Sequence, residues 1–203
     1  GLLLTNGFIK LSAWYIASRY RDDPMVKLTV KDSLLADSLN RSDSWQISWM
    51  GAPLADHWTY EKGSGQKEVV VFSNCEKVDL FLNRELMATL ERSDFPDGVM
   101  RFTIPFEPGT LMAKAYFEDE GGRTRFTSDT LVTSARPYAL AMRPDKDEVR
   151  ANSRDLVHIT TEVLDSAGIL YPHGDQLVNY ELNGPGDIRV IDNGDMADHS
   201  PVK

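Results

Sequence analysis

Three of the four tryptophans are close together in the sequence, and aromatic rings of this kind are side chains on which proteins stack sugar rings. Trp45 and Trp49 are four residues apart, and Trp58 follows beside His57. A spacing of four places Trp45 and Trp49 on one face of a helix or of a strand alike. Two interpretations stay open: a carbohydrate contact at residues 45–58, or packing in a core or between domains, where each ring buries about 150–250 Å². Packing is the favoured interpretation, and His57 is expected to be a hydrogen-bonded loop histidine.

A second cluster has the side chains of a possible cation site. Asp192, Asn193, Asp195 and Asp198 fall within seven residues, with Gly194 between them. Closely spaced oxygen ligands around a glycine turn are what a Ca²⁺ loop uses. The cluster lacks the spacing of an EF-hand and its final bidentate glutamate, so an ordinary Asx-rich turn is favoured. Asp192, Asp195 and Asp198 are kept as metal candidates.

The other polar residues do not form a catalytic set. The four histidines are far apart in sequence, no pair has the spacing of a zinc site, and no G-x-S-x-G motif occurs. Catalysis by a pair of carboxylates needs the two groups close together in a cleft that raises the pKa of one of them. The acidic residues here, for example at 22–23, 119–120 and 145–148, fall in turns or at solvent-facing strand positions. We therefore assign no catalytic residue and expect no cofactor.

The composition restricts the partners. The chain has 31 acidic and 22 basic residues, and its net charge of −9 is spread along the sequence. Such a charge repels a phosphate backbone, so nucleic acid is not expected to bind. No apolar run approaches the ~20 residues of a membrane-spanning helix. The single cysteine, Cys75, cannot form an internal disulfide and leaves the redox compartment open.

Alternating apolar and polar residues predict antiparallel strands through the middle of the chain. Within residues 76–83, Val78, Leu80 and Leu82 share one face, which is the period of a strand. Short strands at this spacing, separated by glycine and proline turns, indicate a β-sandwich. The further strands are predicted at residues 25–30, 68–72, 100–106, 111–117 and 123–133.

The segments on either side of this sandwich differ from it. Residues 12–21 predict one amphipathic helix that Ser12 can cap, and its large aromatic side chains need a surface on which to dock. A linker is predicted at residues 134–137. The strand pattern then restarts, with strands predicted at residues 138–142, 156–164, 177–182 and 188–191.

This second unit is shorter than the ~100 residues of an immunoglobulin-like sandwich. We therefore expect its second sheet to be unfinished. An unpaired edge strand is a template for pairing with another chain, so a homo-oligomer formed through that edge is a further expectation.

Several segments have sequence motifs that are more specific than the general pattern of a β-sandwich. The strongest are NCEKVDLFLN with EPGTLMAKAY, and LVNYELNGPG with DNGD, supported by GLLLTNGFIK and DHWTY. Together they cover nearly the whole chain. The sequence resembles the C-terminal part of family 2 glycoside hydrolases, the β-galactosidase-like members of gut Bacteroidetes.

This resemblance implies a domain organisation. Residues 1–23 would be the last loop and helix of a catalytic (β/α)8 barrel, residues 24–134 an immunoglobulin-like sandwich, and residues 135–203 a second one, incomplete at its C-terminal end. The fold class would be all-β with a short helical remnant. The two catalytic glutamates of the family lie earlier in the barrel. In related β-glucuronidases an Asn-x-Lys pair near the barrel's end holds the sugar carboxylate, and Lys10 is the matching lysine.

The function implied is that of a non-catalytic accessory part of a larger glycosidase. It would buttress the catalytic barrel of the parent chain and would hydrolyse nothing alone. The alternative is a carbohydrate-binding module that uses residues 45–58. A periplasmic or secreted location is expected, with any export signal outside these residues.

Overall fold

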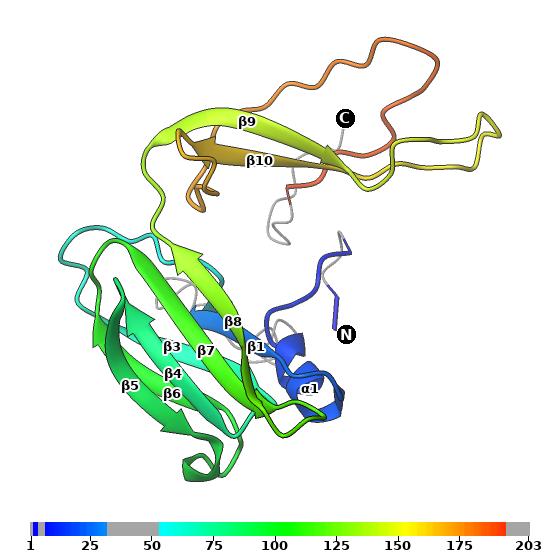
Figure 1. Cartoon of the computed structure of the whole chain (residues 1–203). Helices are drawn as coiled ribbons and strands as arrows, with labels where there is room; N and C mark the ends of the chain where they lie inside the picture. The colour runs from blue at the N-terminus through cyan, green and yellow to red at the C-terminus, as the bar shows by residue number, and fades with distance from the viewer. Residues whose placement is uncertain (1, 4–6, 32–52, 194–203) are drawn as a thin grey trace, which may run out of the picture.

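The computed structural model of the chain describes residues 2–3, 7–31 and 53–193 (Figure 1). Within these residues the protein is mostly β, with one α-helix, one 3-10 turn and ten strands. Eight strands form two four-stranded antiparallel sheets, and the last two form a separate hairpin.

The first sheet has the strand order β2-β1-β3-β6 and the second has the order β5-β4-β7-β8. The strands of the first sheet are β1 (Val26–Lys31), β2 (Leu54–Ala55), β3 (Gln66–Ser73) and β6 (Met100–Pro105). Those of the second are β4 (Lys77–Leu82), β5 (Glu85–Glu91), β7 (Thr110–Glu118) and β8 (Thr124–Val132), with a 3-10 turn, η1 (Arg92–Asp94), after β5.

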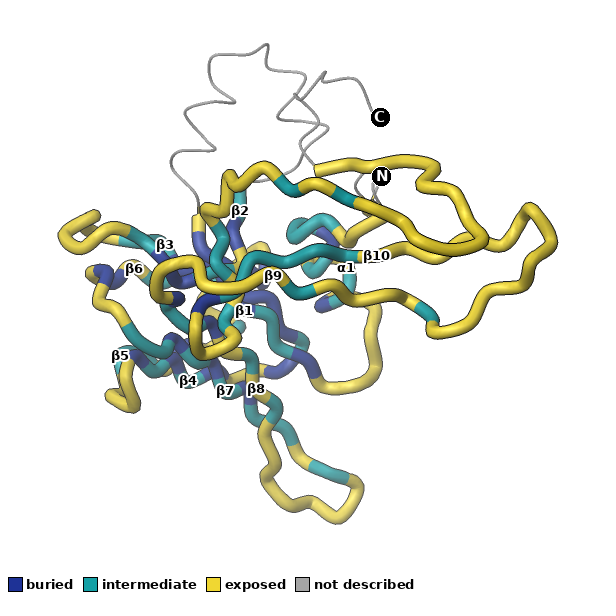
Figure 2. Tube along the Cα trace, turned by 90° about the horizontal axis from the view of Figure 1, so that it is seen from above, coloured by how far each residue is buried: buried dark blue, intermediate teal, exposed yellow. Residues whose placement is uncertain are grey.

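The two sheets pack face to face over one hydrophobic core, which lies at the centre of the tube in Figure 2. In β4, Val78, Leu80 and Leu82 are buried while the residues between them are not, so the predicted alternation is confirmed. Burying one such side chain contributes about 1.5–3 kcal/mol. The five other strands predicted for this region, at 25–30, 68–72, 100–106, 111–117 and 123–133, correspond to β1, β3, β6, β7 and β8.

The predicted helix is α1 (Ala13–Tyr20), and it packs on the outer face of the first sheet. Trp14 lies against a small cluster formed by Val70, Phe72 and Val99. The predicted cap is wrong: Ser12 already has helical dihedral angles and its side chain makes no capping hydrogen bond. The helix is held by this packing, because an isolated helix this short is marginal in water.

The hairpin consists of β9 (Pro137–Pro144) and β10 (Ile159–Asp165). These correspond to the strands predicted at residues 138–142 and 156–164. The strands predicted at residues 177–182 and 188–191 are wrong, since these segments have no regular structure and are largely exposed. A strand exists only when its backbone groups pair with a neighbour. No such neighbour lies beside these segments in the described part of the chain.

Candidate functional site

The DHWTY segment connects the sandwich to the chain that leads into the hairpin. Trp58 is fully buried, and its ring packs edge-on against Phe106, with 5.2 Å between centroids. Its indole nitrogen Nε1 donates a hydrogen bond of 2.9 Å to the carbonyl oxygen of Glu107. The carbonyl oxygen of Trp58 accepts a hydrogen bond from the Thr133 hydroxyl. The core therefore fixes this segment from one side, and the segment fixes the end of β8 from the other.

Thr59 uses its side chain and both of its peptide groups to bond to His57 in its own segment and to two other segments, at Ser134 and His173. Its hydroxyl oxygen accepts the N–H of Ser134 at 2.9 Å and lies 3.1 Å from the Ser134 hydroxyl. Its own N–H donates to Nδ1 of His57 at 3.2 Å. Its carbonyl oxygen lies 2.9 Å from Nε2 of His173. Because a carbonyl only accepts, that nitrogen of His173 must carry the hydrogen.

We call the cluster of His57, Trp58, Thr59, Ser134 and His173 the joint. His57 and His173 are 5.0 Å apart between ring centroids and meet edge to face at 78°. His173 follows β10, and we call β9, β10 and the residues that follow them the hairpin unit. Its contact with Thr59 brings the hairpin unit against the sandwich across 114 residues of sequence. The joint therefore connects two parts of the fold between which the described residues form no β-ladder.

Asp165 makes a second connection, at the end of β10. It is buried, with an exposed fraction of 4%. Its carboxylate accepts backbone N–H bonds from Ala135 at 2.8 Å, from Ala167 at 2.8 Å and from Ile169 at 2.9 Å. These hydrogen bonds, with that from Ala135 foremost, hold the pKa of Asp165 below its ordinary value. The ionised carboxylate thus fixes the linker to the turn of the hairpin unit.

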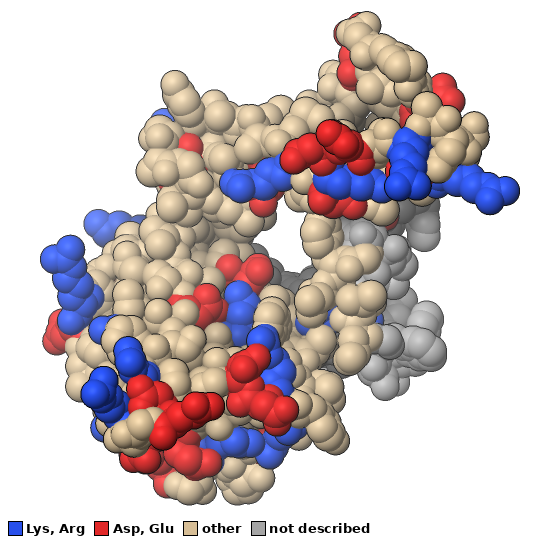
Figure 3. Space-filling view, turned by 45° about the vertical axis from the view of Figure 1, so that its right-hand side comes forward, with Lys and Arg blue, Asp and Glu red and all other residues tan. Residues whose placement is uncertain are grey.

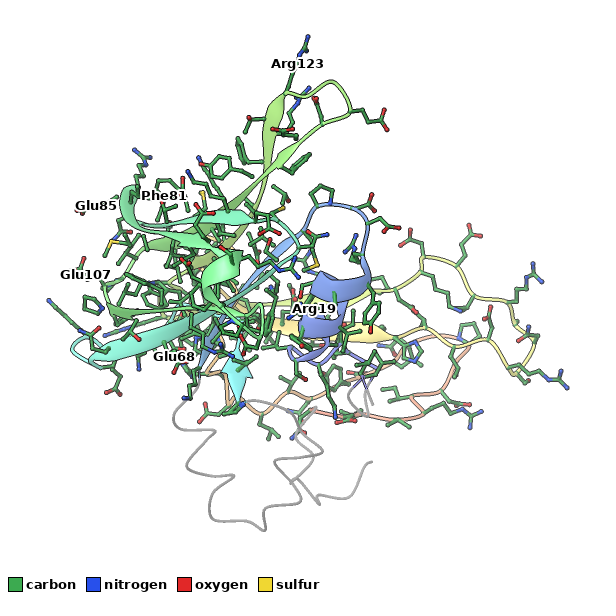
Figure 4. All side chains as sticks on the ribbon, turned by 90° about the horizontal axis from the view of Figure 1, so that it is seen from below. Arg19, Glu68, Phe81, Glu85, Glu107 and Arg123 are labelled. Atoms are coloured by element: carbon green, nitrogen blue, oxygen red, sulfur yellow. The ribbon has the colours of Figure 1, made fainter. Side chains whose placement is uncertain are left out.

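Asn74 makes a third connection, between the sandwich and the segment that follows α1. Its amide nitrogen donates to the carbonyl oxygens of Arg21 at 3.0 Å and Asp23 at 2.9 Å. Its amide oxygen accepts the N–H of Met25 at 2.8 Å. From α1 itself, Arg19 donates to the carbonyl oxygen of Asp97; its position on the helix is labelled in Figure 4.

Of the two interpretations left open for Trp58, packing or carbohydrate contact, the burial of its ring is incompatible with the carbohydrate contact. A ring with no exposed surface cannot stack on a sugar, and Trp58 is 0% exposed. The packing interpretation is the one that fits this residue. Trp45 and Trp49 lie outside the described residues. His57 is hydrogen-bonded, as predicted.

The metal and barrel candidates remain predictions. Asp192 is exposed, and Asp195 and Asp198 lie outside the described residues. Among the residues that are described, no three His, Cys, Asp or Glu side chains come close enough to hold a metal ion. Lys10 is half-buried beside the Leu3–Ile9 bridge, and its N–H donates to the carbonyl oxygen of Leu2.

The roles of His173 and Asp165 as structural connections are not predicted from the sequence. The neighbouring sequence does not predict the contact of His173 with the sandwich, because its partners there, His57 and Thr59, are more than a hundred residues away. Asp165 had a signal: an aspartate that opens a turn ending in Gly168 commonly accepts the N–H groups of that turn. Its bond to the linker could not be read from the turn alone.

The surface shows no continuous basic region on the face drawn in Figure 3, where cations and anions are interspersed. Along the hairpin unit, Arg143 pairs with Glu162 at 2.8 Å and Lys146 with Asp155 at 2.9 Å. In the part of the chain that is described, no helix has the length and hydropathy to cross a membrane.

Two domain families match this chain. A domain of unknown function, DUF4982, matches residues 58–122, and the glycoside hydrolase family 2 C-terminal domain 5 matches residues 140–203. The beta-galactosidase BoGH2A of Bacteroides ovatus is 30% identical over 141 residues, which are 70% of this chain and 16% of that protein. A putative beta-glucuronidase of Formosa agariphila is 30% identical over 166 residues, covering 76% of this chain and 15% of that protein.

A solved structure of a family 2 member is also similar to this chain. A glycosyl hydrolase family 2 member from Bacteroides cellulosilyticus superposes with a TM-score of 0.70 and 26% sequence identity, covering 84% of this chain and 22% of that one. The chain belongs to the C-terminal region of glycoside hydrolase family 2.

This family 2 chain spans about a sixth of the length of the curated relatives, at 16% and 15%. The two matched segments of the family 2 chain meet at the joint. The first begins at Trp58, inside the joint, and the second begins at Leu140, within β9. The joint therefore connects the two segments that the domain families recognise separately.

Proposed function

We propose that this chain is a non-catalytic accessory part of a β-galactosidase-like family 2 glycosidase. Its role is to hold the sandwich, the hairpin unit and the helical segment in one arrangement behind the catalytic barrel of the parent. The observation that carries the proposal is the joint, where Thr59 alone bonds to His57, Ser134 and His173. Because its hydroxyl group, N–H and carbonyl group are all hydrogen-bonded within the protein, Thr59 supports a positioning role rather than a catalytic one.

The carboxyl groups support the same conclusion. A glycosidase acid needs a pKa raised by burial, so that it keeps its proton at neutral pH. Where the pKa of a described aspartate is displaced, hydrogen bonds to the ionised form lower it. These residues are Asp97, Asp119, Asp145, Asp155 and Asp165. They favour the wrong protonation state for a general acid.

The finer organisation belongs to this proposal. Residues 24–134 would be an immunoglobulin-like domain, because two antiparallel sheets sharing one core are the architecture of that fold. Residues 135–203 would belong to a second domain. Residues 1–23 would be the end of the barrel, an assignment supported by exposed apolar side chains such as Leu3, Ile9 and Tyr20.

The parent's barrel is the partner that these exposed side chains would contact. The hairpin unit also exposes apolar side chains at Tyr138, Leu140 and Met142, which alternate along one face of β9. Such a face needs a packing partner. A homo-oligomer and an extracytoplasmic location stay predictions, the first to be checked by light scattering.

The experiment that tests the proposal is an activity assay of the purified chain with a nitrophenyl β-galactoside and a nitrophenyl β-glucuronide. We expect no hydrolysis above that of a mock purification. In a longer parent protein that contains these residues, Thr59→Val should lower activity only by destabilising the protein. Turnover by the chain alone that co-purifies with it through two different columns would contradict the proposal.

A further inference from the structure

An asparagine followed by a glycine lies in the long loop after the hairpin. Residues 171–193 form no helix or strand, and Figure 1 draws the later part of this loop from orange to red. Asn183 and Gly184 are both exposed there. In such a pair the peptide nitrogen of the glycine can attack the carbonyl carbon of the asparagine side chain. Glycine favours this attack because it has no Cβ beside the nitrogen.

Both reacting groups are free to meet. Among the described residues, neither the side-chain amide of Asn183 nor the N–H of Gly184 makes a hydrogen bond. The carbonyl oxygen of Gly184 accepts the N–H of Gly186 at 3.0 Å, which leaves the Gly184 nitrogen unengaged. A Cβ at Gly184 would meet no atom within 4 Å, so packing does not restrict the backbone at this point.

Three asparagines in the ordered elements and turns are held differently. Asn74, Asn83 and Asn152 each use the side-chain amide in two or more hydrogen bonds of 2.8–3.1 Å. An amide held in this way cannot turn towards the peptide nitrogen that follows it. The fold therefore protects these three side chains and leaves Asn183 unprotected.

Asn179 separates the effect of exposure from the effect of the following residue. It is exposed and lies in the same loop, four residues before Asn183, but it is followed by Tyr180. A side chain on the following residue crowds the attacking nitrogen and narrows the backbone angles it can adopt. Exposure alone should therefore leave the Asn179 amide intact for much longer.

We propose that Asn183 is a site of spontaneous deamidation whose co-reactant is water. The Gly184 nitrogen loses its proton to hydroxide and forms a bond to Cγ of Asn183. The bond from Cγ to Nδ2 breaks, and the amide nitrogen leaves as ammonia. Water then opens the five-membered succinimide. Opening at Cγ gives aspartate, and opening at the main-chain carbonyl carbon gives isoaspartate; no atom is oxidised or reduced.

The modification changes the charge and the backbone of the loop. The net charge becomes −10 instead of −9, because a neutral amide becomes a carboxylate. Isoaspartate also lengthens the main chain by one carbon. Asn183 lies within residues 140–203, which the family 2 C-terminal domain matches, and outside the joint. The change therefore accumulates with the age of the protein while the contacts of the joint stay in place.

Mass spectrometry of the 203-residue chain tests this proposal after incubation in mildly alkaline buffer. Trypsin releases residues 155–189 as one peptide, which contains both Asn179 and Asn183. We expect a gain of about one dalton that fragmentation places at Asn183, in two products of equal mass that separate on a column. Conversion at Asn179 should be roughly tenfold slower. A higher pH should speed the reaction at Asn183, because the attacking nitrogen must lose its proton.

A variant and a denatured sample separate the two causes. Gly184→Val should slow conversion at Asn183 roughly tenfold, to the level of Asn179. In guanidinium chloride the rate at Asn183 should stay almost unchanged, since the folded chain already leaves it free. The rate at Asn152 should rise, because unfolding removes its hydrogen bonds to Arg154 and Asp155.

Three results would overturn the proposal. They are equal conversion at Asn179 and Asn183, a rate that Gly184→Val does not lower, and a large acceleration at Asn183 on unfolding, which would mean that the fold protects it. The first and third are measured on the unchanged chain, so they stand even if the variant does not fold. None of them depends on whether the proposed accessory role is correct.

Discussion

Thr59 is the residue on which the connection between sandwich and hairpin depends most. Thr59→Val keeps the shape of the side chain but leaves the Ser134 N–H without its acceptor. An unsatisfied buried group costs about 1–3 kcal/mol, so we expect the free energy of unfolding to fall by that amount in urea titrations. Thr130→Val, at an exposed position on β8, is the control and should change stability little. Equal stability of the two variants would show that the joint contributes nothing.

Asp165 gives a prediction about pH. Its pKa in the folded state is below its ordinary value of 3.8. A lowered pKa means that the stabilisation is complete above the unfolded-state value and is lost as the pH falls towards the folded-state value. The stability difference between wild type and Asp165→Asn should therefore be largest at pH 6 and shrink below about pH 4. Urea titrations across this range check it, and a difference that stays constant with pH would contradict it.

Single residues show where sequence reasoning ends. The sequence does not decide between packing and sugar contact for Trp58, because an aromatic residue in a loop can serve either use. Its burial depends on Phe106 and Glu107, nearly fifty residues away. His57 was expected to be hydrogen-bonded and is, because a loop histidine usually finds a neighbouring peptide group. The ring contact between His57 and His173 depends on the tertiary fold alone.

The turn between β6 and β7 shows how an element is fixed by a glycine. Gly109 has φ of +138°, and a Cβ there would come within 1.8 Å of the Asn83 side-chain oxygen. That oxygen accepts the N–H of Thr110 at 2.9 Å. Gly109→Ala should therefore destabilise the sandwich by more than about 1 kcal/mol. Gly122→Ala is the matched control, since Gly122 also has positive φ, +70°, but has open space around it.

Comparison of the two glycine variants separates the cost of backbone strain from the cost of the steric clash with Asn83. If thermal unfolding shows that both variants lose the same free energy of unfolding, the contact with Asn83 has no cost. Backbone strain alone then explains the effect. The turn itself was predicted, because Pro and Gly in succession favour it. The contact between Asn83 and Gly109 was not, since it joins two turns on neighbouring strand pairs.

Among the strands, too, some could be predicted from the sequence and others could not. Residues 76–83 could be read as a strand because one face is buried and the apolar alternation records it. Residues 177–182 alternate in a similar way but have no regular structure. Alternation reports which side chains would share a face, whereas a strand also needs a neighbour for its backbone.

At the scale of the molecule, the described residues form two sheets, a helix and a hairpin, joined by a few side chains that are far apart in sequence. Family resemblance predicted the order of these parts, and the match to the family 2 C-terminal domain confirmed the family. The relative placement of sandwich and hairpin could not be predicted, because it rests on Thr59, Asp165 and His173, and the described strands form no ladder between these two parts.

The joint should hold the sandwich and the hairpin unit in one arrangement. Distances between spin labels test this directly, with labels on cysteines introduced at the exposed positions Ser128 and Arg154 while Cys75 stays buried. We expect a single narrow distance distribution for the otherwise unchanged chain and a broad one when His173→Ala is added. A broad distribution before His173 is changed, or a narrow one that His173→Ala does not alter, would contradict the central claim.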